Sequence, residues 1–183
     1  MKASPIDEIK AILEVGSSVP QVNVSEWMKS AEIDLQAAIV TLLSEHGDLV
    51  QPPLPGSKSF DYCLGYFKRC LLENPLEGEF TNNRTVEGYT LQRWFRQLWQ
   101  DRSANSKQIS EMKRLITDVY KSGDEGAKYA VETAILEHLF EDPSIQAHFS
   151  DWQSDPELAA AYGRAQEWAA AIDRTGPIES PES

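Results

Sequence analysis

Three histidines are the side chains whose chemistry would serve metal binding or acid–base catalysis: His46, His138 and His148. His138 and Glu141 are spaced i, i+3, which places them on one face of a predicted helix. A helical di-metal site needs Glu-x-x-His on two helices with further carboxylates, whereas here the order is reversed and occurs once. We therefore interpret the histidines as structural or exposed and predict no metal and no cofactor. The alternative is a helical metal-binding protein or enzyme that uses His138, Glu141 and acidic residues from other helices.

The two cysteines offer little for catalysis. Cys63 and Cys70 are seven residues apart on a predicted helix, about 10 Å along its axis, which is too far for a disulfide. We expect reduced, buried thiols, with a nucleophilic Cys63 as the alternative. The sequence contains no His-Glu-x-x-His, Cys-x-x-Cys, glycine-rich phosphate loop or Gly-x-Ser-x-Gly motif. No catalytic residue is nominated, and we interpret the chain as a binding protein rather than an enzyme.

Arginine and aromatic residues mix in residues 93–102, as in platforms that bind single-stranded nucleic acid. On a helix, however, Trp94, Phe95 and Leu98 project to one face, while Arg93 and Arg96 project to the other. An acidic domain would also repel phosphates. We predict no nucleic-acid partner, and we expect these arginines to pair with acidic helices of the same domain or of a second copy.

Acidic side chains concentrate in the last third of the chain. The net charge is −4 for residues 1–58, +2 for residues 59–122 and −10 for residues 123–183. Such an excess can simply keep a protein in solution, or it can attract a basic partner and accelerate its capture. We adopt the second interpretation. The residues that we predict to bind this partner are Glu132, Glu137, Glu141, Asp142, Asp151, Trp152, Asp155 and Glu157.

Two details of this acidic segment need explanation. Glu137 and Glu141 form a like-charge pair at i, i+4 spacing, which costs a few tenths of a kcal/mol unless something compensates. Trp152 lies between Asp151 and Asp155, so it could serve as an aromatic anchor inside an acidic rim, as in interface hot spots. Packing in the core is the alternative for this tryptophan.

Helical periodicity and capping residues predict the elements that position these side chains. Ser4-Pro5 begins the first helix and Gly16 ends it, while Ser25 begins a longer helix that ends at Gly47. The proline-rich residues 51–57 form a connection. The other predicted helices cover approximately residues 59–74, 90–100, 106–123, 127–142 and 156–172.

Residues 75–89 are predicted to be irregular or at most a short hairpin, the kind of segment in which function often lies. No stretch shows the alternation that a strand needs. The predicted fold is therefore all-α: an irregular bundle of about seven helices in a single domain over residues 1–172, followed by a flexible acidic tail over residues 173–183.

Composition limits the setting of this fold. The chain has 183 residues, 41% of them hydrophobic and 25% charged, and a net charge of −12, as expected of a folded globular protein. No uncharged apolar run approaches the roughly 20 residues that span a bilayer, and the acidic N-terminus lacks the pattern of an export signal. We expect a cytoplasmic protein without a membrane partner. The sequence leaves its oligomeric state open.

The segment from Tyr129 to Asp142, followed by Phe149, Trp152, Asp155-Pro156-Glu157-Leu158 and Tyr162, resembles helical immunity proteins that bacteria encode beside secreted polymorphic toxins. The resemblance lies in size, acidity and helical character over roughly residues 60–172, and no single residue is placed by it. It implies a protein that binds a cognate toxin and covers the toxin's active or substrate-binding cleft. A structural subunit of a larger assembly remains an alternative.

Overall fold

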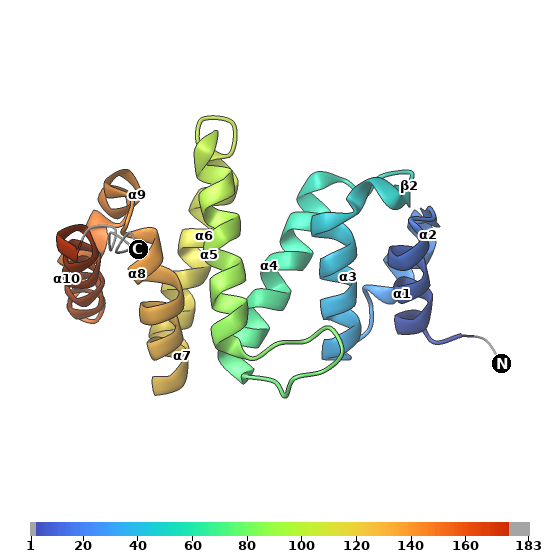
Figure 1. The fold of residues 1–183 in the computed structure, drawn as a ribbon, viewed down its shortest axis with the longest axis horizontal. Helices are drawn as coiled ribbons and strands as arrows, with labels where there is room; N and C mark the ends of the chain where they lie inside the picture. The colour runs from blue at the N-terminus through green and yellow to red at the C-terminus, as the bar shows by residue number, and fades with distance from the viewer. Residues whose placement is uncertain (1–2, 176–183) are drawn as a thin grey trace, which may run out of the picture. The chain divides into compact units, whose positions relative to one another are not determined.

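The computed structural model describes residues 3–175, and its contacts divide the chain into two compact units, residues 1–87 (unit 1) and residues 88–183 (unit 2). Within the described residues the fold is all-α, as predicted (Figure 1). None of these helices is long and apolar enough to cross a membrane. The single domain over residues 1–172 stays a prediction.

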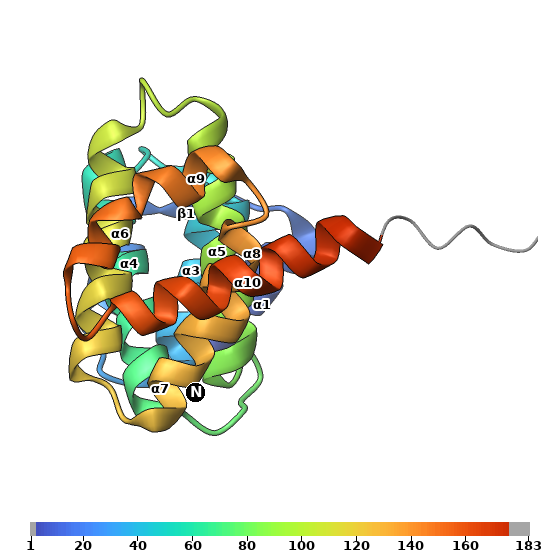
Figure 2. The ribbon, with the colours of Figure 1, turned by 90° about the vertical axis from the view of Figure 1, so that its left-hand side faces the viewer.

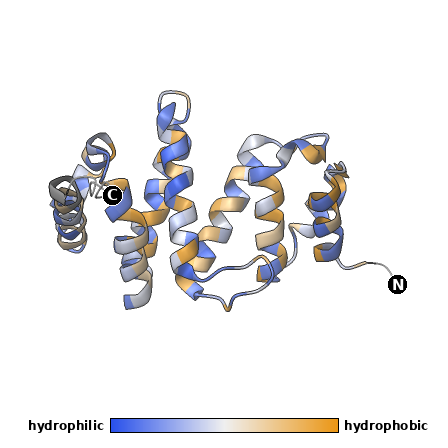
Figure 3. Cartoon of the chain, viewed as in Figure 1, coloured by the Kyte–Doolittle hydropathy of each residue, from blue (hydrophilic) through white to orange (hydrophobic). Residues whose placement is uncertain are grey.

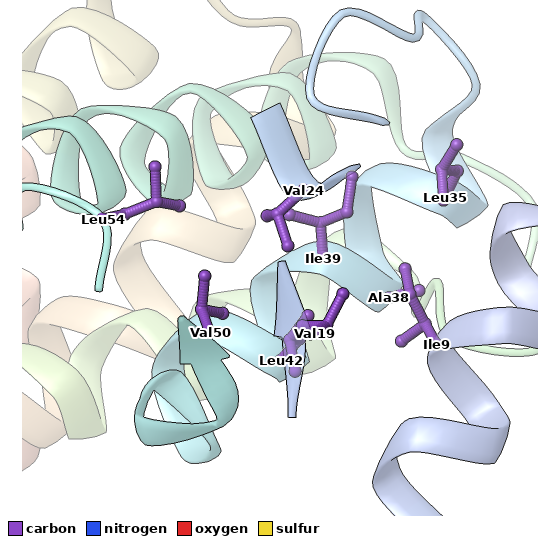
Figure 4. Packing of buried hydrophobic residues seen from close by; sticks show 9 residues of the cluster. All are labelled: Ile9, Val19, Val24, Leu35, Ala38, Ile39, Leu42, Val50 and Leu54. Carbon is purple, nitrogen blue, oxygen red and sulfur yellow. The ribbon is translucent and has the colours of Figure 1, made fainter. Parts of the chain in front are cut away.

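Unit 1 begins with short helices and ends with a long one. Its elements are α1 (Pro5–Val15), β1 (Val19–Pro20), α2 (Gln21–Trp27), α3 (Ile33–Glu45), a 3-10 turn (Gly47–Leu49), β2 (Val50–Gln51) and α4 (Gly56–Glu73). The α1 helix has the predicted caps: the Ser4 hydroxyl accepts a hydrogen bond from the Asp7 amide, and Gly16 adopts φ 70°. The core of unit 1 gathers α1, α2 and α3 around Val19, Val50 and Leu54 (Figure 4).

Unit 2 consists of helices that continue from α5 (Arg84–Gln100), which starts in unit 1. The further elements are α6 (Ser106–Ser122), α7 (Glu125–Ala130), a π-helical segment (Val131–Leu136), α8 (Glu137–Leu139), α9 (Pro143–His148), a 3-10 turn (Ser150–Ser154) and α10 (Ala159–Thr175). The α10 helix packs against α8 and the π-helical segment (Figure 2). Apolar and polar residues form separate stripes along these helices (Figure 3), which explains why their periodicity was readable.

Two predicted helices have bounds that differ clearly from the observed ones. The helix predicted from Ser25 to Gly47 is two helices, because the chain turns after Trp27, where the Ser30 hydroxyl accepts from the Glu32 amide and starts the next segment. The helix predicted from about Thr90 begins at Arg84. There the side-chain oxygen of Asn83 accepts hydrogen bonds from the amides of Thr85 and Val86, so a residue assigned to a loop is a helix cap.

A short parallel pair of strands was also missed. Val19 lies opposite Val50, and Pro20 lies opposite Gln51. Two residues per strand are too few for sequence alternation to show. At the other end, α10 extends beyond the predicted end of the domain to Thr175, and residues 176–183 of the predicted acidic tail lie outside the described residues.

Candidate functional site

Glu132 is one of the residues that we predicted to bind a partner, and the structure places it in an internal ion pair. The Arg164 guanidinium donates to both carboxylate oxygens of Glu132, over 2.7 Å from Nε and 2.5 Å from Nη2. The Tyr120 hydroxyl donates to the same carboxylate over 2.8 Å. The hydrogen bond from Arg164 is the main cause that lowers the pKa of Glu132. This carboxylate therefore holds α10 against the π-helical segment and α6.

Glu141 is likewise engaged within unit 2. Its carboxylate accepts from Arg96 over 2.8 Å and lies 3.0 Å from Nδ1 of His138. Arg96 also donates to the backbone carbonyl of His138. This arrangement offsets the like-charge repulsion between Glu137 and Glu141. It also confirms that an arginine from residues 93–102 pairs with an acidic helix of the same protein.

Three further predicted residues have structural partners. Asp151 pairs with Lys113 over 2.5 Å, and Asp155 pairs with Lys121. Asp142 caps α9, because its carboxylate accepts from the amide and the hydroxyl of Ser144. Lys113 and Lys121 of α6 therefore each neutralise one carboxylate that seemed unpaired along the sequence.

Two predicted residues are left with fewer contacts. Glu157 is exposed, and no ion pair involves it within the described residues. Glu137 is half-buried, and burial raises the pKa of its carboxyl group. Glu167 on α10 is exposed like Glu157, although we did not predict that it binds a partner. These carboxylates, rather than the paired ones, are available to an approaching partner.

Trp152 corrects one prediction. Its side chain is only 1% exposed, and its indole nitrogen donates to the Thr117 hydroxyl over 3.2 Å. It packs edge-on against Phe149, with ring centroids 5.6 Å apart. Trp152 is a core residue, which was the alternative interpretation, because the 3-10 turn that carries it points the ring inward against α6. It offers no anchor to a partner.

A shallow groove on unit 2 gathers side chains that the sequence analysis did not combine. Its volume is about 620 Å³, and it lies between the end of α5 and the turn from α8 into α9. The residues that line it are Arg96, Trp99, Gln100, Arg102, Glu141, Asp142, Pro143, Ser144 and Ile145. The groove therefore combines two arginines, two carboxylates and an aromatic ring.

Trp99 is fixed in this groove from several sides. Its indole nitrogen donates to the Ser144 hydroxyl over 3.0 Å, and its ring stacks on Phe95, with centroids 5.9 Å apart. The Arg102 guanidinium lies 5.5 Å from the ring centroid, within the range of a cation–π contact. Asp142 and Pro143 begin α9 at the point that brings Ser144 to the indole.

A row of aromatic rings, in which Tyr89 is exposed and His138 and Trp168 are half-buried, continues from the groove. The Tyr89 ring lies 5.3 Å from the His138 ring, which in turn lies 5.0 Å from the Trp168 ring. The Arg96–Glu141 ion pair joins this row to the groove. We call the set of Tyr89, Arg96, Trp99, His138, Glu141 and Trp168 the aromatic strip. It draws on α5, α8 and α10, together with the turn after α8.

Close helix packing aligns the strip. A Cβ on Gly88 would lie 2.9 Å from the Cβ of Ala134, so only glycine lets α5 approach the π-helical segment this closely. The π-helical segment adds a wide turn to the rod that α7 and α8 form, a feature that is frequent at functional sites. The wide turn rotates the residues that follow it about the helix axis, and this rotation places the His138 ring against the Tyr89 ring. No sequence pattern reveals a π-helical turn, which is why the strip was not foreseen.

The histidines and cysteines do not assemble a metal site. Among the described residues, no three His, Cys, Asp or Glu side chains group as ligands. His138 contacts the Glu141 carboxylate, and Arg96 donates to the other oxygen of that carboxylate. Cys63 and Cys70 are buried and free, as expected, and burial raises the pKa of each thiol to about 12. Thiols of this kind are poor nucleophiles.

Comparison with known proteins identifies no relative: no protein-family model, no curated protein and no solved structure matches the chain.

Proposed function

We propose that this protein is a non-catalytic binding protein that captures a basic protein partner through the aromatic strip. The observation that carries the proposal is the composition of the strip, which holds a tyrosine, two tryptophans and an arginine in one connected row. Tyrosine, tryptophan and arginine are the residue types enriched at energetic hot spots of protein interfaces.

The strip is also rigid, which favours binding. Trp99 is hydrogen-bonded through Ser144, and Arg96 is held by Glu141. Side chains that are already fixed lose little rotamer entropy when a partner covers them. The groove beside them gives the partner a concave surface of mixed charge.

Charge supports a basic partner. The net charge of the chain is −12, and exposed carboxylates such as Glu157 and Glu167 have no counter-ion in the described ion pairs. Surface potentials of this sign steer a basic protein toward the binding surface and raise the association rate. The attraction acts over a distance, whereas the aromatic strip supplies the short-range contacts.

We further propose that the partner is a bacterial toxin, and that the protein neutralises it by covering the toxin's active or substrate-binding cleft in the cytoplasm of the producing cell. Size, acidity and helical character, which resemble those of helical immunity proteins, support this step. Toxins that act on nucleic acids or nucleotides have basic clefts, and an acidic protein is complementary to them.

The test is affinity capture of the tagged full-length protein from the cells that produce it, washed at low and then at high salt. We expect one basic partner in near-stoichiometric amount, with the complex weakened by salt. Tyr89→Ala, on the strip, should reduce the captured amount at least about tenfold, since hot-spot tyrosines contribute at least about 1.4 kcal/mol. Addition of the purified protein should block the partner's toxicity.

Tyr129→Ala is the matched control, because Tyr129 is 67% exposed in the same unit and lies outside the strip. The Tyr129→Ala variant should capture as much of the partner as the wild type does. Recovery of the protein alone would refute the proposed function. If Tyr89→Ala captured as much partner as the wild type, the assignment of binding to the strip would be refuted. If the captured partner were not toxic, the proposal that the protein is a toxin inhibitor would be refuted.

A further inference from the structure

Unit 1 contains a loop without regular structure that is nevertheless held firmly. Residues 74–83 connect α4 to α5. The Asp34 carboxylate of α3 accepts hydrogen bonds from the backbone amides of Glu79, Phe80 and Thr81 over 2.8 to 3.2 Å. The Thr81 hydroxyl donates to the same carboxylate over 2.9 Å. We call residues 74–83 the clamped loop. Hydrogen bonds to a charged group are stronger than those between neutral groups, so one aspartate restrains residues 79–81 of the loop.

Further contacts fix the remaining parts of the clamped loop. Asn74 ends α4 in the left-handed conformation, and its side chain accepts from the Arg84 amide over 3.1 Å. Glu79 pairs with Lys10 of α1 over 2.5 Å. The Gly78 amide donates to the Thr81 carbonyl over 2.9 Å. The backbone on both sides of residues 75–77 is therefore restrained.

The clamped loop partly buries one large apolar side chain and exposes another. Phe80 packs against the core of unit 1, whereas Leu76 is 92% exposed, the highest value among the exposed large hydrophobic residues described. Pro75 before it has a restricted φ. Leu76 therefore gains almost no hydrophobic stabilisation from the fold, because its side chain stays in water.

The surroundings of Leu76 indicate what covers it. Glu77, its neighbour, accepts a hydrogen bond from the neutral amide of Asn83, so this contact leaves the charge of Glu77 uncompensated. Unit 1 as a whole contains seven basic and thirteen acidic side chains. An apolar tip beside an uncompensated carboxylate is complementary to an apolar pocket with a basic rim.

We propose that the clamped loop is a second, preorganised docking element, which inserts Leu76 into an apolar, basic-rimmed pocket of the protein partner. The inference rests on the proposed function and adds a contact on unit 1 to the aromatic strip on unit 2. Since Asp34 fixes the loop before binding, the partner meets a backbone that is already ordered, and the association costs less conformational entropy.

The experiment places the photo-crosslinking residue p-benzoylphenylalanine at position 76 of the full-length protein and irradiates the producing cells. The control carries it at Val22, which is 72% exposed on α2 of the same unit. We expect one adduct from position 76, with the basic protein captured through the aromatic strip, and no such adduct from position 22. An adduct with a second copy of this chain, with an acidic protein, or no adduct at all would overturn the inference.

Affinity measurements with the captured partner separate this inference from the proposed function. Leu76→Ala should weaken binding about tenfold or more, and Val22→Ala should leave it unchanged. Asp34→Asn should release the protection of the Glu79, Phe80 and Thr81 amides in hydrogen exchange and weaken binding with Leu76 intact. Unchanged affinity of Leu76→Ala refutes the docking element alone, whereas failure of the wild type to capture any partner refutes both proposals.

Discussion

Gly78 shows how a single residue decides the shape of the clamped loop. A Cβ at this position would lie 2.3 Å from Oδ1 of Asp34, closer than real atoms approach. Gly78→Ala should therefore displace the carboxylate from the loop amides and lower the free energy of unfolding by about 1–3 kcal/mol. Urea unfolding followed by circular dichroism measures this change.

Gly65 provides the control for that substitution. It lies inside α4, and a Cβ there would meet no atom within 4 Å. Gly65→Ala should raise the free energy of unfolding by about 0.5–1 kcal/mol, because alanine restricts the unfolded chain and favours the helix. Equal effects of the two substitutions would contradict the role of Gly78 in the clamped loop.

His148 gives unit 2 a dependence on pH. Burial, followed by the nearby Lys113 ammonium, lowers the pKa of His148 from its usual 6.5, while Asp151 opposes the shift. The unfolded chain then binds the proton more readily than the folded protein. The stabilisation from neutral His148 is complete above the unfolded pKa and is lost as the pH falls through the lower folded value.

We expect the urea midpoint to fall as the pH is lowered from about 7.5 to about 5, across the range in which histidine titrates. His148→Phe keeps an aromatic ring beside Trp99 and Phe149 and should flatten this dependence. His46→Gln, which alters no contact of that cluster, should retain it. Parallel pH curves for the wild type and His148→Phe would rule out His148 as the cause.

At the scale of elements, the Glu132–Arg164 ion pair decides how α10 is held. Glu132→Lys would bring two positive charges together and leave the Tyr120 hydroxyl without its acceptor. We expect a loss of about 2 kcal/mol in the free energy of unfolding. Glu167→Lys reverses a charge on the exposed face of α10 and should change it by less than about 0.5 kcal/mol. Similar values in urea unfolding would show that the pair is unimportant.

This result changes how the acidic surface is to be tested. Glu132, Asp151 and Asp155 are the obvious carboxylates for charge reversal from the sequence, but each has a basic partner within unit 2. Their reversal would mix a loss of stability with a loss of attraction. Periodicity predicts the face of a helix on which a residue lies, but it does not predict which other helix packs against that face.

The charge of the whole molecule is distributed more evenly than the sequence suggested. Residues 1–87 contain seven basic and thirteen acidic side chains, and residues 88–183 contain ten and sixteen, so each unit has a net charge of −6. The excess in the last third of the chain is offset because α5 and α6, which carry many of the bases, belong to the same unit. The proposed attraction of a basic partner is therefore expected from the charge of the entire chain and not from its last third alone.

The steering prediction follows from this net charge. A double variant with Glu157→Lys and Glu167→Lys changes the net charge by +4 without breaking a described ion pair. Its association rate with the captured basic partner should fall several-fold at low salt and approach the wild-type rate at high salt, where screening removes long-range attraction. Stopped-flow measurements across salt concentrations provide the test. An unchanged low-salt rate would exclude steering.

The sequence by itself determined the features that depend on neighbours along the chain. Helices begin or end where predicted at Ser4-Pro5, Gly16 and Asn74-Pro75. Helix ends are predictable because a cap forms hydrogen bonds with residues nearby in the sequence. Apolar periodicity likewise located α6, whose buried residues match the predicted stripe. Such local interactions were sufficient to establish the all-α fold.

Only the tertiary structure decided which side chains are free. Asp34 reaches the clamped loop across more than forty positions of the sequence, and Trp152 is buried whereas Trp99 and Trp168 are half-buried. Burial and pairing depend on the residues that packing brings opposite, and these are distant along the chain. The aromatic strip and the exposure of Leu76 arise from that packing, so no local pattern specifies them.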